Sequence, residues 1–204
     1  GLRGGADGCS IPPDAVAAFG DDLTALNLAD QNLIGQVPNL ALAFPLLTTL
    51  NLKANTRLDA GPVWDWIQNL TELRSLELEK TNRNGNLEDV VLPSSKKNMM
   101  VVSLGWNAFD AGPLPSWITD FQTLSAFRLA NTNREGDLGN LDLAKTKQTL
   151  SEVRLEYASG MRAGPIPKWL NAGYDKLQTF HSTGMNIYGT KADDPSACAA
   201  AYAA

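Results

Sequence analysis

The chain has 204 residues, of which 44% are apolar, 19% are charged and 29 are leucine. This length suits one domain, and the leucine-rich, charge-poor composition excludes a disordered chain. The net charge of −5 opposes nucleic-acid binding, which needs clustered Lys and Arg, and no apolar run approaches the roughly 18 residues that span a bilayer.

Residues 1–22 are expected to form an N-terminal cap. They are Gly-rich up to Gly8, and a short Ala-rich helix is expected from Asp14 to Phe19, with Gly20 at its exit. The chain starts with Gly rather than Met, and no basic-then-apolar signal segment precedes the repeats. We therefore expect a processed piece of a longer protein.

Seven similar segments follow, each with the apolar-x-x-apolar-x-apolar pattern of a short strand. Their central apolar residues recur at steps of 24, 26, 26, 25, 26 and 27 residues: Leu26, Leu50, Leu76, Val102, Phe127, Val153 and Phe180. Side chains alternate along a strand, so Leu26 and Leu28 share a face that one repeat cannot bury alone. Successive repeats must therefore stack, with their strands in one parallel sheet and the remaining residues crossing over behind it.

Features outside the strands add to this pattern. One repeat ends in Gly35-Gln-Val37-Pro38, and Asn55 and Asn107 follow their strands at equivalent places. With these features the chain resembles the plant-type extracellular class of leucine-rich-repeat proteins. The resemblance implies an α/β solenoid over residues 23–190. This would be a right-handed coil of about seven repeats, with one short parallel strand per repeat on the concave face.

A second periodicity spans two repeats. Asp59-Ala-Gly61-Pro62 recurs 51 residues later as Asp110-Ala-Gly112-Pro113, and a related segment ends at Gly164-Pro165. The residues that keep the same spacing are Trp66, Trp117 and Trp169, together with the Thr-Asn-Arg segments ending at Arg83 and Arg134. These observations indicate that a pair of repeats was duplicated. The tryptophans are predicted to pack under the crossover.

The two cysteines, Cys9 and Cys198, fall in opposite caps, since residues 191–204 are predicted to be a C-terminal cap remnant or tail. Six strand steps separate the caps by at least about 29 Å, whereas a disulfide needs Cα atoms within about 7 Å. The two cannot pair with each other. Each is either a free thiol or has lost a partner that lies outside the chain.

The sequence contains little catalytic or metal-binding chemistry. His181 is the single histidine, and the scattered Cys and acidic residues do not form a metal-ligand motif. We expect His181 to be a surface strand residue, and we predict no enzyme activity, no cofactor and no metal. Asn69-Leu-Thr71 is the only glycosylation sequon and weakly indicates a secreted glycoprotein.

The outward-facing strand positions form columns across the repeats, and these columns are uneven. Repeats four to seven gather aromatic and Arg side chains, which are the types enriched at binding hot spots. The candidate binding residues are Trp106, Arg128, Asn131, Arg154, Glu156, Tyr157 and His181. The alternative is a solvated sheet face on which Trp106 folds over Arg128 or Arg154 through a cation–π contact.

The resemblance implies a non-catalytic recognition module that binds a partner through the concave face. A protein partner is favoured, a polysaccharide is possible, and the place of action would be extracellular or at the cell surface. The alternative is a structural module of a larger surface, matrix or multi-subunit assembly.

Overall fold

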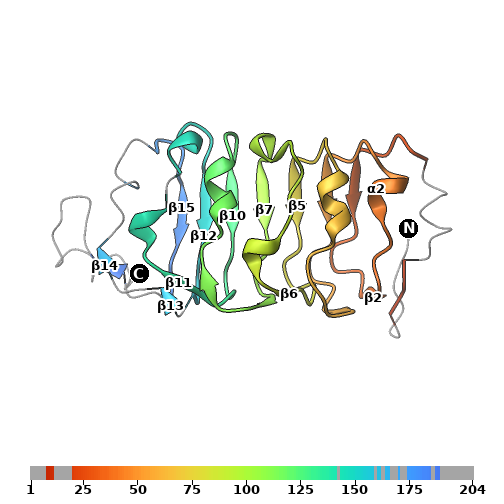
Figure 1. Cartoon of the computed structure of the whole chain (residues 1–204), viewed down its shortest axis with the longest axis horizontal. Coiled ribbons are helices and arrows are strands. Elements are labelled where there is room, and N and C mark those ends of the chain that lie inside the picture. Colours follow the sequence, from red (N-terminus) through yellow and green to blue (C-terminus); the bar gives the residue numbers. More distant parts are fainter. Residues whose placement is uncertain are drawn as a thin grey trace.

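The repeats form one continuous parallel sheet. The computed structural model describes residues 8–11, 20–141, 143–158, 160–161, 164–165, 170, 174–184 and 187–188. Its seven-stranded sheet has the order β1-β3-β5-β7-β10-β12-β15, with every neighbouring pair parallel (Figure 1). The strands are β1 (Ala25–Asn27), β3 (Thr49–Asn51), β5 (Ser75–Glu77), β7 (Val101–Ser103), β10 (Ala126–Arg128), β12 (Glu152–Arg154) and β15 (Thr179–His181).

The strand register confirms the predicted repeat. The central apolar residues pair in sequence order, beginning with Leu26 opposite Leu50 and ending with Val153 opposite Phe180. From Leu50 to Val153 these side chains are completely buried, because each is covered by the repeats on both sides. Because each of these repeats contributes such a residue, the hydrophobic core extends along the whole stack. Burial of each of these side chains stabilises the fold by about 1.5–3 kcal/mol. The predicted leucine-rich-repeat solenoid is therefore the observed fold.

A second, interrupted row of short parallel strands runs beside the sheet. It consists of β2 (Ile34–Gly35) with β4 (Arg57–Leu58), β6 (Asn84–Gly85) with β8 (Ala108–Phe109), β9 (Gly112–Pro113) with β11 (Arg134–Gly136) and β13 (Gly160–Met161), and β14 (Gly164–Pro165) with β16 (Ile187–Tyr188). The interruptions fall at the Gly-Pro turns. Phe109 pairs with the preceding repeat, whereas Gly112 pairs with the following one.

Two buried arginines bridge these turns and explain the second periodicity. Arg83 donates hydrogen bonds to the carbonyl oxygens of Thr81, Pro62 and Asp59, so it holds both ends of the first Gly-Pro turn. Arg134 makes the same three contacts one unit later, with Thr132, Pro113 and Asp110. Both side chains are almost completely buried. The Thr-Asn-Arg segment of one repeat thus binds the Gly-Pro turn of the repeat before it.

Amide side chains connect the strand ends in two places. Asn55 accepts from the backbone N–H groups of Gln31 and Leu33 and donates to the carbonyl oxygens of Leu28 and Leu52. Asn107 makes the equivalent four contacts around Thr81 and Arg83. Each Asn therefore satisfies buried backbone groups of two successive repeats, which an apolar side chain cannot do.

Short helical turns form the crossovers behind the sheet. They are α2 (Leu40–Ala43) and the 3₁₀ helices η1 (Asp65–Asn69), η2 (Leu87–Asp89), η3 (Lys96–Asn98), η4 (Ser116–Asp120), η5 (Leu138–Asn140) and η6 (Ala144–Thr146). Trp117 packs under the crossover as predicted, since it is 6% exposed and contacts Phe121 edge-on. Trp66 is only half-buried, and Trp169 lies outside the described residues.

The described part of the N-terminal segment joins the first repeat. Cys9 forms a parallel bridge with Leu33, and Ile11 is buried against the core. Cys9 is a free thiol, while Cys198 and the helix expected over residues 14–19 lie outside the described residues. The cap and tail boundaries, 1–22 and 191–204, stay predictions.

Candidate functional site

The candidate site is on the open sheet face, defined here as the outward side of β1 to β15 with the turns that follow the strands. In each repeat the third residue after the end of the strand has a left-handed backbone, with φ of 54° at Lys80, 56° at Trp106 and 59° at Tyr157. Its N–H donates to a carbonyl oxygen of the next repeat, for example from Trp106 to Ala130 at 2.7 Å. This conformation costs a non-Gly residue about 1–2 kcal/mol, and the backbone hydrogen bonds between successive turns offset that cost.

Trp106 and Tyr157 form an aromatic ridge on these turns. Their ring centroids lie 6.0 Å apart at 62°, although Asn131 and its whole repeat stand between them in sequence. Trp106 is 43% exposed and Tyr157 is 50% exposed, so two large rings contact solvent on alternate turns. Edge-to-face pairs of this kind are worth about 0.5–1.5 kcal/mol beyond burial, which holds the ridge in one arrangement.

The cation over Trp106 is not the one expected from the sequence. Lys80 Nζ lies 5.1 Å from the ring centroid, so the predicted stacking on Arg128 or Arg154 is wrong. The reason is geometric: Lys80 shares the left-handed turn position with Trp106 in the preceding repeat, whereas Arg128 and Arg154 stand on the strands and bind carboxylates.

Small residues keep the backbone close below the ridge. A Cβ atom at Gly105 would lie 2.9 Å from the carbonyl oxygen of Ala130, nearer than a side chain allows. Ala130 itself is buried. The turn of Trp106 can therefore bond directly to the next turn, and larger residues at these two positions would separate them.

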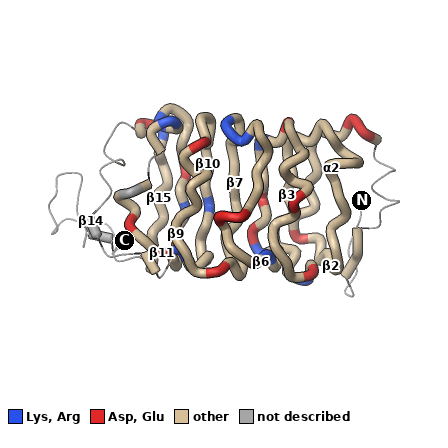
Figure 2. The backbone as a smooth tube through the Cα atoms, in the orientation of Figure 1, with Lys and Arg blue, Asp and Glu red and all other residues tan. Residues whose placement is uncertain are grey.

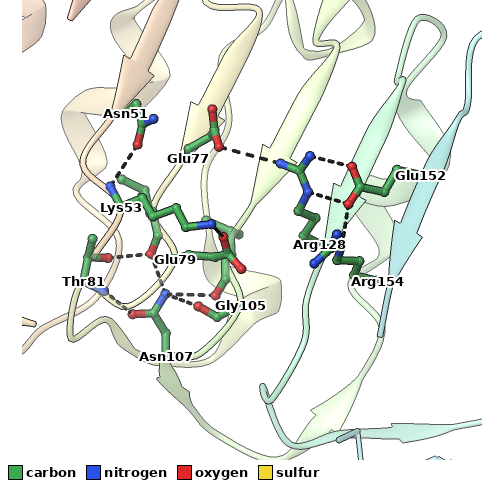
Figure 3. A network of polar contacts seen from close by, with 12 residues as sticks. Asn51, Lys53, Glu77, Glu79, Thr81, Gly105, Asn107, Arg128, Glu152 and Arg154 are labelled. Carbon is green, nitrogen blue, oxygen red and sulfur yellow. Dashed lines mark hydrogen bonds and ion pairs between the residues drawn. The ribbon is translucent and has the colours of Figure 1, made fainter. Parts of the chain in front are cut away.

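A charge row, defined as Glu77, Arg128, Glu152 and Arg154, crosses the strands (Figure 3). Arg128 binds both oxygens of Glu152, with Nε–Oε1 at 3.0 Å and Nη2–Oε2 at 2.5 Å. It also reaches Glu77 at 3.7 Å over the intervening strand, where the small side chain of Ser103 leaves space. Arg154 Nε lies 2.5 Å from the same Glu152 carboxylate.

These contacts set the charges of the row. The hydrogen bond from Arg128 lowers the pKa of Glu152 below its ordinary value, with Arg154 acting in the same direction and burial opposing it. The same bond to Glu152 raises the pKa of Arg128. Arg128 and Glu152 therefore both stay ionised at neutral pH, as a bonded pair.

A hydrogen-bonded pair and an ion pair flank the row. Glu156 Oε1 lies 2.7 Å from Nδ1 of His181, whose side chain is exposed on β15. Lys53 Nζ lies 2.5 Å from Glu79, a carboxylate that is otherwise buried beside the turns. Figure 2 shows basic and acidic residues distributed along the solenoid.

All seven residues predicted as a binding patch lie on the open sheet face, but they fall into separate groups. Trp106 contacts Tyr157, Arg128 and Arg154 share Glu152, and Glu156 pairs with His181. Asn131 is exposed on the turn between the two rings. Their role in binding stays a prediction.

Sequence reasoning missed Lys80, Glu77 and Glu152. Glu152 stands in the strand column beside Arg128 and Arg154, so opposite charges on neighbouring strands were the available signal. Lys80 occupies the same turn column as Trp106, one repeat earlier, and that shared position was the signal for the cation–π contact.

The described ranges contain neither a metal-binding cluster nor a membrane-spanning helix. Within the described ranges, no three His, Cys, Asp or Glu side chains lie close enough to hold a metal ion. The helices of the same ranges are all too short or too polar to cross a bilayer. Asn69, the sequon residue, is exposed at the end of η1, so its side chain is accessible to glycosylation.

The geometry defines a leucine-rich-repeat solenoid with an aromatic and charged open sheet face. No protein-family model matches the sequence, and no curated protein matches it. Solved structures share the fold: the ectodomain of the Arabidopsis receptor kinase HAESA in complex with an IDA peptide hormone ligand has a TM-score of 0.70 at 21% identity, over 88% of this chain and 29% of that one.

Two more structures show the range of the likeness. The ectodomain of GASSHO1/SCHENGEN3 from Arabidopsis thaliana, in complex with CASPARIAN STRIP INTEGRITY FACTOR 2, has a TM-score of 0.61 at 23% identity, over 88% of this chain and 20% of that one. A plant ice-binding protein has a TM-score of 0.51 at 18% identity, over 90% and 71%. The chain spans only 20% to 36% of the similar receptor structures. At these identities the comparisons establish the fold.

Proposed function

We propose that the chain is a non-catalytic recognition module whose open sheet face binds an extended peptide segment of a protein partner. The observation that carries the proposal is the aromatic ridge. Trp106 and Tyr157 are both about half exposed on left-handed turns, with Lys80 stacked on Trp106. Exposed aromatic rings held in one arrangement offer a large contact area at low entropic cost.

The charge row favours a polypeptide over a polysaccharide on this face. Along the direction in which the repeats stack, it presents Glu77, Arg128 and Glu152 with alternating charge, and Arg154 stands beside Glu152 on the same strand. A peptide can match such alternation with its own side chains, and paired charges of this kind give specificity more than affinity. A neutral sugar chain carries no charges that could match this alternation.

The comparisons support the same reading. HAESA and GASSHO1/SCHENGEN3 were each solved with a peptide or protein ligand, and PEPR1 with AtPEP1. Because HAESA and GASSHO1/SCHENGEN3 were solved as receptor ectodomains, we also propose that this chain acts outside the cell or at its surface, with Asn69 as a glycosylation site. No catalytic activity, cofactor or metal is part of the proposal.

The test uses peptides selected on the protein itself. A displayed library of random 12-residue peptides is panned on the immobilised chain, and the affinity of the enriched peptides is measured by calorimetry for variants. Trp106→Ala is expected to weaken binding by about 10–100-fold, in the range of a hot-spot aromatic residue. Leu42→Ala is the matched control, since Leu42 is an exposed apolar residue on α2, behind the sheet.

Equal affinity for the wild type and Trp106→Ala would contradict the proposal. It would favour the alternative, a structural module of a larger surface or matrix assembly whose open sheet face contacts solvent. An equal loss in Leu42→Ala would contradict the assignment of the site to the sheet.

A further inference from the structure

A second site is suggested by a groove on the crossover side of the coil. The groove, called here the Trp groove, is lined by Gln36, Asn39, Ala60–Trp66 and Arg83 and has a volume of about 520 Å³. It lies where η1 packs beside α2, close to the N-terminal end of the solenoid (Figure 1). Pockets of about 300–1,000 Å³ are typical of small-ligand sites.

Two indole rings form one wall of the groove. Trp64 and Trp66 are stacked with ring centroids 5.8 Å apart at an angle of 20°, and both are only half-buried. The guanidinium carbon of Arg83 lies 4.2 Å from the Trp64 ring centroid. Because Arg83 is itself fixed by backbone carbonyl groups, it holds Trp64 in place. The result is a rigid aromatic platform beside an open cleft.

The duplicated unit shows that the fold does not require this platform. The segment Trp64-Asp65-Trp66 corresponds to Pro115-Ser116-Trp117, 51 residues later. There a proline replaces the first ring, Trp117 is 6% exposed, and its Nε1 donates to the carbonyl oxygen of Leu87 at 3.2 Å. Trp66 Nε1 is buried and has no acceptor within the described residues. Leaving a buried donor unpaired is costly, so the first unit keeps its two rings at a cost that the second unit avoids.

The polar groups around the platform alternate between donors and acceptors. The Asn39 side-chain oxygen accepts from Ala41 N, which directs its amide hydrogens elsewhere, and the exposed Asp65 carboxylate only accepts. Gln36 is fixed by its bond to Asp59 at 2.9 Å. Hydroxyl groups both donate and accept, so a ligand rich in them matches this arrangement. A proline-rich peptide lacks the N–H groups needed to donate to Asp65.

The charged side chains around the groove favour a neutral sugar over an anionic one. Around the groove stand one cation, Arg83, and two carboxylates, Asp59 and Asp65, so an anionic sugar is disfavoured. We propose that the Trp groove binds a neutral oligosaccharide, with a pyranose ring lying on the Trp64–Trp66 platform. Asp65 and Asn39 would bond hydroxyl groups of the sugar. This site is separate from the open sheet face and does not depend on the peptide site proposed there.

The experiment measures binding of defined sugars to the intact chain by calorimetry and tryptophan fluorescence. The probes are cellohexaose, laminarihexaose and chitohexaose, with hexagalacturonate and a proline decamer as comparators. At least one neutral hexaose is expected to bind with a Kd below about 1 mM, and Trp64→Pro is expected to weaken it by about tenfold or more. Trp64 has φ of −66° and Pro115 has φ of −65°, so the substitution copies the backbone of the duplicate.

Two further variants make the result decisive. Asp65→Ala removes an exposed acceptor and is expected to weaken sugar binding without changing the thermal midpoint. Met100→Ala removes an exposed apolar residue away from the groove and is expected to leave sugar binding unchanged. The proposal is overturned if no neutral hexaose binds, if a folded Trp64→Pro variant binds as tightly as the wild type, or if only hexagalacturonate or the proline decamer binds.

Discussion

The two duplicated units, residues 59–85 and 110–136, share the contacts of their arginines but differ in the surroundings of their tryptophans. Arg83 and Arg134 each hold a Gly-Pro turn through the same three carbonyl groups. Trp117 is buried and hydrogen-bonded, whereas Trp66 lines a groove with its indole N–H unpaired. This comparison indicates that the arginine contact is part of the fold in both units, whereas the residues on the outer face of the crossover differ between them.

The largest expected effect comes from removing the shared contact. Arg134→Met would remove the donor that the carbonyl oxygens of Thr132, Pro113 and Asp110 share, the first buried and the other two partly buried. We expect it to lower the free energy of unfolding by about 3 kcal/mol or more. Arg83→Met should cost at least as much, because it also removes the cation above Trp64. Urea unfolding followed by circular dichroism measures both. A loss below about 1 kcal/mol in either variant would show that the turns do not need the arginine.

The sequence predicts the features that recur along the chain, but not those that depend on contacts between folded repeats. The strands were predictable because buried residues such as Leu50 and Leu76 recur at a nearly fixed step, and one repeat cannot bury them alone. The recurrence of Thr-Asn-Arg was also visible. Its role was not, because it depends on which carbonyl groups the Gly-Pro turn leaves unpaired once Gly112 pairs forward and Phe109 pairs back.

The same limit applies to the open sheet face. Trp106 and Tyr157 could be placed on it from their columns, yet their mutual contact depends on the left-handed turns that carry them. The partner of Trp106 was misassigned for the same reason: the turn geometry, not the strand column, brings Lys80 to the ring. Column position alone predicts which face a side chain occupies, and the backbone of the turn decides which neighbour it meets.

A smaller effect is expected at the two tryptophans, where the units differ. Trp117→Phe removes a hydrogen bond to the Leu87 carbonyl oxygen, which keeps its contact with Val90 N–H, and it shrinks a buried ring, so we expect a loss of about 1–3 kcal/mol. Trp66→Phe removes a buried donor that has no acceptor, which favours folding, but it also removes part of the ring that stacks on Trp64. We expect these two effects to offset each other to within about 0.5 kcal/mol. Thermal and urea unfolding of both variants measure the contrast. Equal losses would mean that the two indole N–H groups are equivalent, contrary to the structure.

The smallest expected effect is a difference in pH dependence between Arg128 on the sheet and the two arginines of the duplicated units. Arg83 and Arg134 bind neutral carbonyl groups, and although burial lowers the pKa of both, arginine stays protonated at any ordinary pH. Their contribution to stability should therefore not depend on pH. Arg128 binds the Glu152 carboxylate, and this bond lowers the pKa of Glu152 in the folded chain. The stabilisation that it gives is present above the unfolded pKa of about 4.3 and is lost as the pH falls through the folded value.

Glu152→Gln tests this distinction. At pH 7 we expect it to lower the free energy of unfolding by about 0.5–1 kcal/mol, a modest value because solvent at the sheet surface screens the pair. Between about pH 5 and pH 2 the difference from the wild type should shrink, since protonation removes the same charge that the substitution removes. Asp120, whose pKa is lowered by Lys96, titrates in both proteins and cancels in the comparison. A difference that stays constant over this range would assign the loss to packing, and Arg128 would then resemble the two buried arginines.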